Sequence, residues 1–305
     1  MTITRGEIDV AGRPRTYTLV TPPGGDHDRL LLVFHGSTQN AGVFRSFTGH
    51  AFDHVGGAAV AYLDGFRGNW NDSRKASRFP ARVQNIDDVA FAEAAVKQLG
   101  DGRPAYAAGF SNGGGMVIRL LHERPDLLDG GAVIAAQQPA PDNFVLPGLP
   151  VVPKPALFFH GTKDRVVPYG GGQMAAWARF AFKVGGTMLS APETAAYFAA
   201  RNGITAAPVT ADLPARAGQP GRTSVSRTDY RQAGHAPVTA VVGDDGRGRL
   251  SAPAEAGEPT VTLAMDRETF VVLAGGRRAA GPDDVRVTGD TDLGERVLAA
   301  MGVTP

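Results

Sequence analysis

Residues 105–119 restrict the fold of this chain more than any other stretch does. An apolar run at 105–108 meets the pentapeptide Gly109-Phe-Ser-Asn-Gly113, and a helical pattern begins directly after it. This is the Gly-x-Ser-x-Gly pattern between a strand and a helix, where a tight turn holds the serine under strain at the edge of a sheet. The two glycines let strand and helix approach closely. We predict that Ser111 is a nucleophile at this turn; an ordinary glycine-rich turn is the alternative.

The apolar pattern around this stretch predicts strands that alternate with helices. Continuous apolar runs, typical of strands buried on both faces, occur at residues 30–34, 58–63, 131–136 and 156–159. An alternating pattern over residues 3–20 predicts an antiparallel hairpin. Helices are predicted over residues 86–99 and, after a capping box that begins at Ser190, to about Arg201. This order predicts the α/β class, a mostly parallel sheet with helices on both faces.

The composition restricts the class of protein further. The chain has 305 residues, 43 % of them hydrophobic and 20 % charged, and a formal net charge of +1. Such a balance gives no indication of a nucleic-acid partner, and no apolar run approaches the roughly 18 residues of a membrane span. The chain has no cysteine, which excludes disulfides and thiolate nucleophiles. Because its start shows no signal-peptide pattern, we expect a cytoplasmic location.

A serine hydroxyl is a weak nucleophile at neutral pH and needs a base that an acid orients. In hydrolases with this turn the acid and then the histidine follow the serine along the chain. Asp164 follows the strand predicted at 156–159 and is the predicted acid, with a turn-forming aspartate as the alternative. Only His235 of the seven histidines comes after Asp164. By elimination His235 is the candidate base; an exposed loop histidine is an equally open reading.

The loops at the ends of the predicted strands supply the rest of the site. The oxyanion hole is predicted to use the backbone N–H of Asn112 and a second N–H at Ser37 or Thr38. His35, Gln39 and Trp70 are predicted to border the substrate pocket. For Trp70 the alternative is an anchor of its own loop, and for His35 a brace of its loop.

No metal or cofactor is predicted for this chain. His50 and His54 are spaced four residues apart in a predicted helix and could imitate a metal site, but no third ligand accompanies them. No phosphate-binding glycine loop and no acidic metal cluster occurs. The predicted chemistry therefore rests on side chains and backbone N–H groups alone.

Several runs, taken in order, make the chain similar to a known group of enzymes. They are Val33-Phe-His-Gly-Ser-Thr-Gln-Asn40, Trp70-Asn-Asp-Ser-Arg74, Asp87-Asp-Val-Ala-Phe91, Gly109-Phe-Ser-Asn-Gly-Gly114 and Phe159-His-Gly-Thr-Lys-Asp-Arg-Val-Val-Pro-Tyr169. Residues 1 to about 237 resemble the α/β-hydrolases that include polyhydroxyalkanoate depolymerases and feruloyl esterases. The resemblance implies an α/β-hydrolase fold and cleavage of a small or oligomeric carboxylic ester through an acyl-enzyme. It assigns the nucleophile to Ser111, the acid to Asp164, and the oxyanion role to Asn112 and the 37–38 loop.

The chain departs from this group at the histidine. In the group the histidine usually follows the last strand, but here the turn after residues 237–242 reads Gly243-Asp-Asp-Gly-Arg-Gly248. His235 precedes that strand and is no match to the motif. This departure favours the alternative function, a weak or inactive hydrolase scaffold that acts as a binding module.

The C-terminal residues resemble a different family. Residues from about 240 to 305 are similar to the sterol-carrier-like module of mycothiol-dependent maleylpyruvate isomerase family proteins. Strands are predicted at 260–264 and 285–287, a helix after Asp266, and a closing helix from about 291. We therefore predict an α/β-hydrolase domain over 1–237, which lacks a recognisable terminal strand, histidine and helix, and a small α+β module over 238–305. Lipid binding, dimerisation and simple packing all stay open for this module, as does the oligomeric state.

Overall fold

The computed structural model describes residues 1–182, 184–213, 224–243, 261–264, 285–289 and 291. The chain divides into two compact units, Met1–Ala252 and Pro253–Pro305. The strands of the first unit are β1 (Thr2–Val10), β2 (Arg13–Thr21), β3 (Arg29–Phe34), β4 (Ala58–Leu63), β5 (Ala105–Phe110), β6 (Gly130–Ile134), β7 (Ala156–Gly161), β8 (Gly172–Gln173), β9 (Thr187–Met188), β10 (Val209–Leu213), β11 (Val225–Tyr230) and β12 (Val238–Gly243). Its helices are α1 (Ala41–Phe47), η1 (Ala51–His54), α2 (Pro80–Val83), α3 (Asp88–Leu99), α4 (Asn112–Glu123), η2 (Pro125–Leu127), α5 (Ala176–Phe182) and α6 (Ala191–Arg201).

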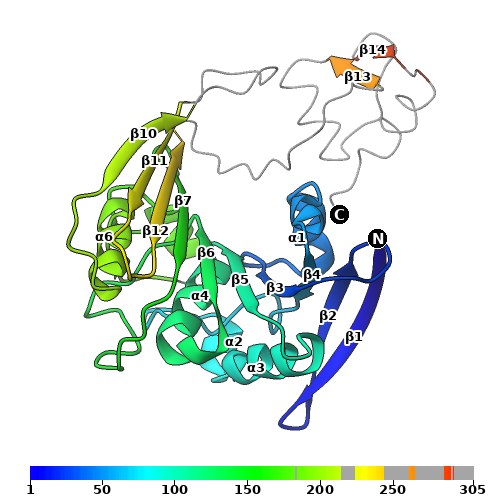
Figure 1. The fold of residues 1–305 in the computed structure, drawn as a ribbon, viewed down its shortest axis with the longest axis horizontal. Coiled ribbons are helices and arrows are strands. Elements are labelled where there is room, and N and C mark those ends of the chain that lie inside the picture. The colour runs from blue at the N-terminus through cyan, green and yellow to red at the C-terminus, as the bar shows by residue number, and fades with distance from the viewer. Residues whose placement is uncertain (183, 214–223, 244–260, 265–284, 290, 292–305) are drawn as a thin grey trace. The chain divides into compact units, whose positions relative to one another are not determined.

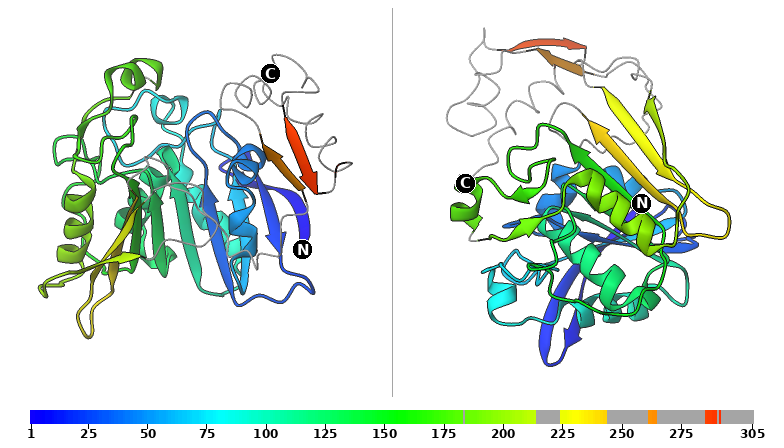
Figure 2. Two further views of the ribbon diagram at one scale, coloured as in Figure 1. Left: turned by 90° about the horizontal axis from the view of Figure 1, so that it is seen from above. Right: turned by 90° about the vertical axis from the view of Figure 1, so that its left-hand side faces the viewer.

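One ten-stranded sheet runs through the first unit in the order β1-β2-β4-β3-β5-β6-β7-β12-β11-β10 (Figure 1). Its neighbours from β4 to β12 are parallel. Antiparallel strands form the two ends, β1 with β2 and β10 with β11 (Figure 2). The carboxyl ends of the parallel strands therefore share one edge of the sheet, where α/β proteins build their sites.

Both faces of the sheet are covered, because successive side chains of a strand point to opposite faces. In β3, Leu30, Leu32 and Phe34 join the core under α3, α4 and α6. Leu31 and Val33 join the core under α1 and η1. A strand packed on both faces must be apolar throughout, which explains the continuous runs in the sequence. The predicted α/β fold class is confirmed.

The last parallel strand corrects the predicted domain boundary. β12 pairs with β7 along its whole length, from Val238 beside Ala156 to Gly243 beside Gly161. The sheet therefore continues past residue 237, and the first unit ends at Ala252. The terminal strand that the sequence left in doubt is present, so β7 is an interior strand and no exposed edge.

The second unit is described only in part. β13 (Val261–Ala264) and β14 (Arg286–Gly289) form an antiparallel pair near the two predicted strands. The predicted helix after Asp266 and the closing helix from about 291 lie outside the described residues. The resemblance to a sterol-carrier-like module thus stays a prediction. In the described part of the chain, no helix has the length and apolar character needed to cross a membrane.

Candidate active site

Ser111 occupies the sharp turn between β5 and α4. Its backbone has φ 52° and ψ −115°, a conformation that a residue with a side chain rarely adopts. A Cβ atom added to Gly109 would lie 2.2 Å from the carbonyl oxygen of Gly113, and one added to Gly113 would lie 2.2 Å from that of Phe34. The spacing Gly-x-Ser-x-Gly therefore follows from the close contact of β5, α4 and β3. The strained turn has the geometry predicted for a nucleophile.

The hydroxyl of Ser111 is uncommitted. Ser111 is the N-cap of α4 by position, but its side chain makes no capping hydrogen bond. Within the described ranges, Oγ has no other hydrogen-bond partner. The backbone N–H of Ser111 donates to Ile134 at 2.8 Å, which ties the turn to β6. The side chain is thus free to react while the backbone is fixed.

Two backbone N–H groups near the turn are also free in the described part of the molecule, those of Ser37 and Asn112. The loop after β3 lies against the turn, since a Cβ on Gly36 would come within 2.9 Å of the Phe110 ring. The N–H of Thr38 donates to the carbonyl of Gly68 at 2.8 Å, so it cannot serve as an oxyanion donor. The predicted second donor, Ser37 or Thr38, is therefore Ser37. The first predicted donor, Asn112, lies at the positive N-terminus of α4.

Three residues predicted to border the pocket contact the loop after β3 or belong to it. The Nε2 of fully buried His35 accepts the N–H of Gly65 at 2.9 Å, so its Nδ1 carries the proton and donates to Gly36 at 2.7 Å. Burial lowers the pKa of His35 and keeps it neutral. The Trp70 indole N–H donates to the His35 carbonyl at 2.9 Å, and Gln39 Oε1 accepts the N–H of Gly36 at 3.0 Å. These contacts fit the alternative roles of brace and anchor.

Asp164 follows β7 and stands where the acid was predicted. Its Oδ1 accepts the backbone N–H groups of Val166 and Val167 at 2.8 and 2.9 Å, the pattern of a turn-forming aspartate. Its Oδ2 lies 3.8 Å from Nε2 of His160. One carboxylate oxygen therefore fixes the turn, and the second has no hydrogen bond in the described part of the chain.

His235 lies at the opposite edge of the sheet from Ser111. It precedes β12, whose first residue, Val238, is beside Ala156, the first residue of β7. Ser111 follows the last residue of the parallel strand β5, and a six-residue strand spans about 20 Å. The Nδ1 of His235 lies 2.9 Å from the carbonyl of Ala233. This placement corrects the prediction that His235 is the base.

None of the other histidines takes its place. All seven lie in the described part of the chain, and none forms a hydrogen bond with Ser111. Buried His160, the one beside Asp164, has its Nε2 2.9 Å from the Val167 carbonyl, and its Nδ1 has no partner. His50 and His54 are exposed, and the described residues contain no group of acidic and histidine side chains that could hold a metal.

A cleft that is open to solvent lies beside Ser111. Its floor is the turn itself, and its walls come from the loops that follow β4, β6 and β7. The lining residues are Ser73, Arg74, Ser111, Gly115, Ala135, Ala136, Gln137, Val167, Met174 and Met188. The cleft is mostly apolar, with a few polar groups beside the nucleophile, as is usual for small-molecule sites.

The strained serine turn, the adjacent loop after β3 and the following aspartate are together the features of one fold. The first unit has the α/β-hydrolase fold. No family model matches the chain. The chain is 36 % identical over 180 residues to Putative esterase NocK of Nocardia uniformis subsp. tsuyamanensis. This match covers 56 % of this chain and 51 % of that protein. It is 32 % identical over 155 residues to Feruloyl esterase B of Piromyces equi, covering 47 % of this chain and 27 % of that one.

The chain thus spans about half the length of one curated relative and about a quarter of the other. Among solved structures, Est1E from Butyrivibrio proteoclasticus is 19 % identical, with a TM-score of 0.39 over 58 % of this chain and 83 % of that one.

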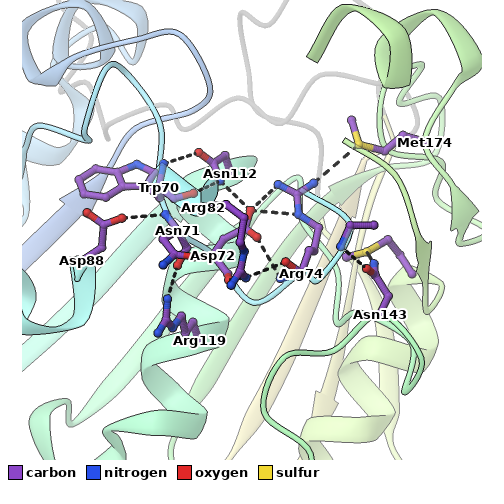
Figure 3. A network of polar contacts seen from close by, with 12 residues as sticks. Trp70, Asn71, Asp72, Arg74, Arg82, Asp88, Asn112, Arg119, Asn143 and Met174 are labelled. Carbon is purple, nitrogen blue, oxygen red and sulfur yellow. Dashed lines mark hydrogen bonds and ion pairs between the residues drawn. The ribbon is translucent and has the colours of Figure 1, made fainter. Parts of the chain in front are cut away.

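The α/β-hydrolase domain also contains a buried polar network that the sequence did not reveal (Figure 3). The Asn112 side chain accepts the backbone N–H of Trp70 at 2.8 Å and donates to the Asp72 carboxylate at 2.6 Å. Asp72, fully buried, also accepts from Nε and Nη2 of Arg74. The network fixes the 70–74 loop to the first turn of α4. The only sequence signal for it is the run Trp70-Asn-Asp-Ser-Arg74 itself.

Proposed function

We propose that this chain is a carboxylic ester hydrolase that forms an acyl-enzyme on Ser111. The observation that carries the proposal is the strained, uncommitted Ser111 hydroxyl beside the free N–H groups of Ser37 and Asn112. The similarity to two proteins described as esterases supports an ester as the substrate.

In the proposed reaction Ser111 Oγ attacks the ester carbonyl carbon. The N–H groups of Ser37 and Asn112 donate to the oxyanion of the tetrahedral intermediate, and the positive end of α4 adds to its stabilisation. Collapse expels the alcohol and leaves the acyl group on Ser111, which water then removes. Asp164, which follows β7, is proposed as the acid that would orient a base.

The step of this scheme that lacks a catalytic group is the removal of the proton from Ser111 Oγ. No histidine is hydrogen-bonded to Oγ, so in this scheme water takes the proton during attack, and water attacks the acyl-enzyme without the help of a base. Enzymes that have lost a triad member keep roughly 10³–10⁴-fold acceleration over water from the oxyanion hole and binding alone. We therefore propose slow turnover with a rate-limiting release of the acyl group.

Labelling by a fluorophosphonate tests the nucleophile. We expect one label per chain, loss of the label in Ser111→Ala, and retained labelling in the control Ser37→Ala, because only the backbone of Ser37 is used. Folded protein that takes up no label would contradict the proposal. That result would favour the second candidate, a binding scaffold, which is also favoured by the lack of a hydrogen bond between Ser111 and any of the seven histidines, all of them in the described part of the chain.

Hydrolysis of 4-nitrophenyl butyrate tests the missing base. We expect a burst of one equivalent of nitrophenol, a slow steady state, and no rise of the rate through the histidine range near a pKa of about 6.5. His235→Ala should leave both phases unchanged. A loss of several orders of magnitude in this variant would return His235 to the site.

A further inference from the structure

One guanidinium group lies directly in the cleft of the nucleophile. Arg74 lines the cleft together with Ser111, and its side chain is only 10 % exposed. The carboxylate of Asp72 accepts from its Nε and Nη2 (Figure 3). A guanidinium has five N–H groups in a rigid fork, so this pairing fixes its plane and leaves Nη1 for another partner.

The partner that Nη1 has is a weak one. It lies 3.7 Å from Sδ of Met174 (Figure 3), another residue that lines the cleft. A thioether sulfur is a poor hydrogen-bond acceptor. A desolvated cationic N–H group at the wall of a cleft would gain more from an oxygen acceptor, above all from a charged one.

The charges around Arg74 leave one positive charge in excess. Arg74 is paired with Asp72, and Arg119 is paired with Glu123. Half-buried Arg82 interacts electrostatically with all four of these groups, but it donates through Nη2 only to the backbone carbonyl oxygens of Asp72 and Arg74 and forms no ion pair within the described ranges. An anion beside Arg74 would therefore meet a net positive charge in a site with little water.

Ser73 provides a second, independent observation. It is fully buried and lines the cleft, yet its Oγ has no hydrogen-bond partner. Buried polar atoms in native proteins are almost always paired. An unpaired hydroxyl next to the nucleophile is therefore suited to donate to a group that arrives with the substrate.

We propose that Arg74 Nη1 and Ser73 Oγ bind a carboxylate of the substrate, and that the chain prefers esters whose acyl group ends in a carboxylate. The inference rests on the proposed function, because the cleft is defined by its position at Ser111. It adds two specificity-determining residues to that function and narrows the ester to the half-esters of dicarboxylic acids.

Two matched esters test the preference, mono(4-nitrophenyl) adipate and 4-nitrophenyl hexanoate, which differ by a terminal carboxylate. Adipate is chosen because its carboxylate is too distant to close a five- or six-membered anhydride. One good hydrogen bond to a charged group corresponds to roughly 10–100-fold, so we expect acylation of the adipate ester to have a kcat/KM higher by that factor. Equal values for the two esters in the wild-type chain would overturn the proposal.

The variants assign the preference to its residues. Arg74→Met should reduce the ratio of the two kcat/KM values to near one, whereas Arg78→Met, an exposed arginine of the same loop, should leave both values unchanged. Because Arg74→Met leaves Asp72 without its main partner and can unfold the loop, Ser73→Ala is the second test. Its removed Oγ makes no hydrogen bond, and we expect the ratio to fall roughly 3–10-fold. An unchanged ratio in Ser73→Ala removes that residue from the proposed site.

Titration calorimetry with adipate separates this inference from the proposed function. If neither ester is cleaved and Ser111 takes up no fluorophosphonate, the proposed function fails, and binding of adipate that is lost in Ser73→Ala still supports the carboxylate site. No binding of adipate overturns it. Gln137 also lines the cleft, and its buried Oε1 has no hydrogen-bond partner. An amide oxygen accepts from a hydroxyl, so the ester 4-nitrophenyl 6-hydroxyhexanoate tests whether Gln137 binds the end of the acyl group in place of Arg74 and Ser73. A preference for this ester over the adipate ester would show a site for a neutral hydroxyl and contradict the proposal.

Discussion

The buried histidine of α4 gives the most quantitative prediction, a loss of stability in mild acid. His122 is 3 % exposed. Its Nδ1 lies 2.8 Å from the carbonyl of Ile118 and its Nε2 lies 3.0 Å from the Tyr197 hydroxyl, so it joins α4 to α6. Burial, assisted by the charge of Arg201, lowers the pKa of His122 to about 4. The folded chain therefore holds this histidine neutral.

The sign of the effect follows from the two pKa values. In the unfolded chain the pKa of a histidine is about 6.5. Above that pH both states are neutral and the stability is fully present. As the pH falls, the unfolded state binds the proton first, so stability is lost between about pH 6.5 and pH 4. A shift of 2.5 units corresponds to about 3 kcal/mol in total, of which about 2 kcal/mol is lost by pH 5.

Urea unfolding at pH 8 and pH 5 measures this loss, with the fluorescence of buried Trp70 reporting the hydrolase domain. The matched variant is His122→Phe, which keeps the ring contacts with Phe144 and Phe198. We expect it to be less stable at pH 8 by about 1–2 kcal/mol, because two hydrogen bonds are lost. Between pH 8 and pH 5 the wild type should lose about 2 kcal/mol more than the variant. His35, whose pKa is also lowered by burial, is common to both chains. An equal pH dependence of the two chains would refute the reasoning.

Two further predictions concern the backbone at the site. In Gly113→Ala the new Cβ would lie 2.2 Å from the carbonyl oxygen of Phe34. We expect urea unfolding to show a free energy of unfolding lower by at least about 3 kcal/mol, and we expect no fluorophosphonate labelling. The control Gly56→Ala, whose Cβ would meet nothing within 4 Å, should keep the stability and the labelling of the wild type. Thr38, a β-branched residue with φ 61°, is strained, so Thr38→Gly should raise the free energy of unfolding by about 1 kcal/mol; a lower value would show that its side chain stabilises the loop.

Local signals allowed most of the elements to be predicted from the sequence. The capping box that begins at Ser190 is present, with Glu193 and Ser190 bonded reciprocally at the start of α6. The β1–β2 hairpin turns at Ala11 and Gly12, both with positive φ, as a two-residue hairpin turn requires. β10 and β11 were missed because their side chains are largely exposed or polar, which leaves no apolar pattern to detect.

The site was predictable where it depends on neighbours in the chain and unpredictable where it depends on distant ones. The turn at Ser111 follows from its own glycines. The contact of Asn112 with Asp72 joins residues 40 positions apart, and no period or motif encodes it. His235 was chosen by its order in the chain, yet a residue that precedes a parallel strand lies at the amino edge of the sheet, away from the carboxyl edge where the reacting groups gather.

The contrast between the support for Ser111 and the absence of a base has a mechanistic consequence. The turn is maintained by glycines that tolerate no side chain and by a buried network around Asp72, whose partners must all be present because an unpaired buried charge costs several kcal/mol. In the proposed reaction these features would stabilise the oxyanion and orient the nucleophile, which would help both the attack on the ester and the release of the acyl group. A base would assist acylation and deacylation alike. Acylation by an activated ester needs the base less, since the expelled nitrophenolate requires no proton. Deacylation has no such good leaving group, so the missing base slows it more. The arrangement therefore predicts that acylation outpaces deacylation, and that the acyl-enzyme on Ser111 is the species that accumulates.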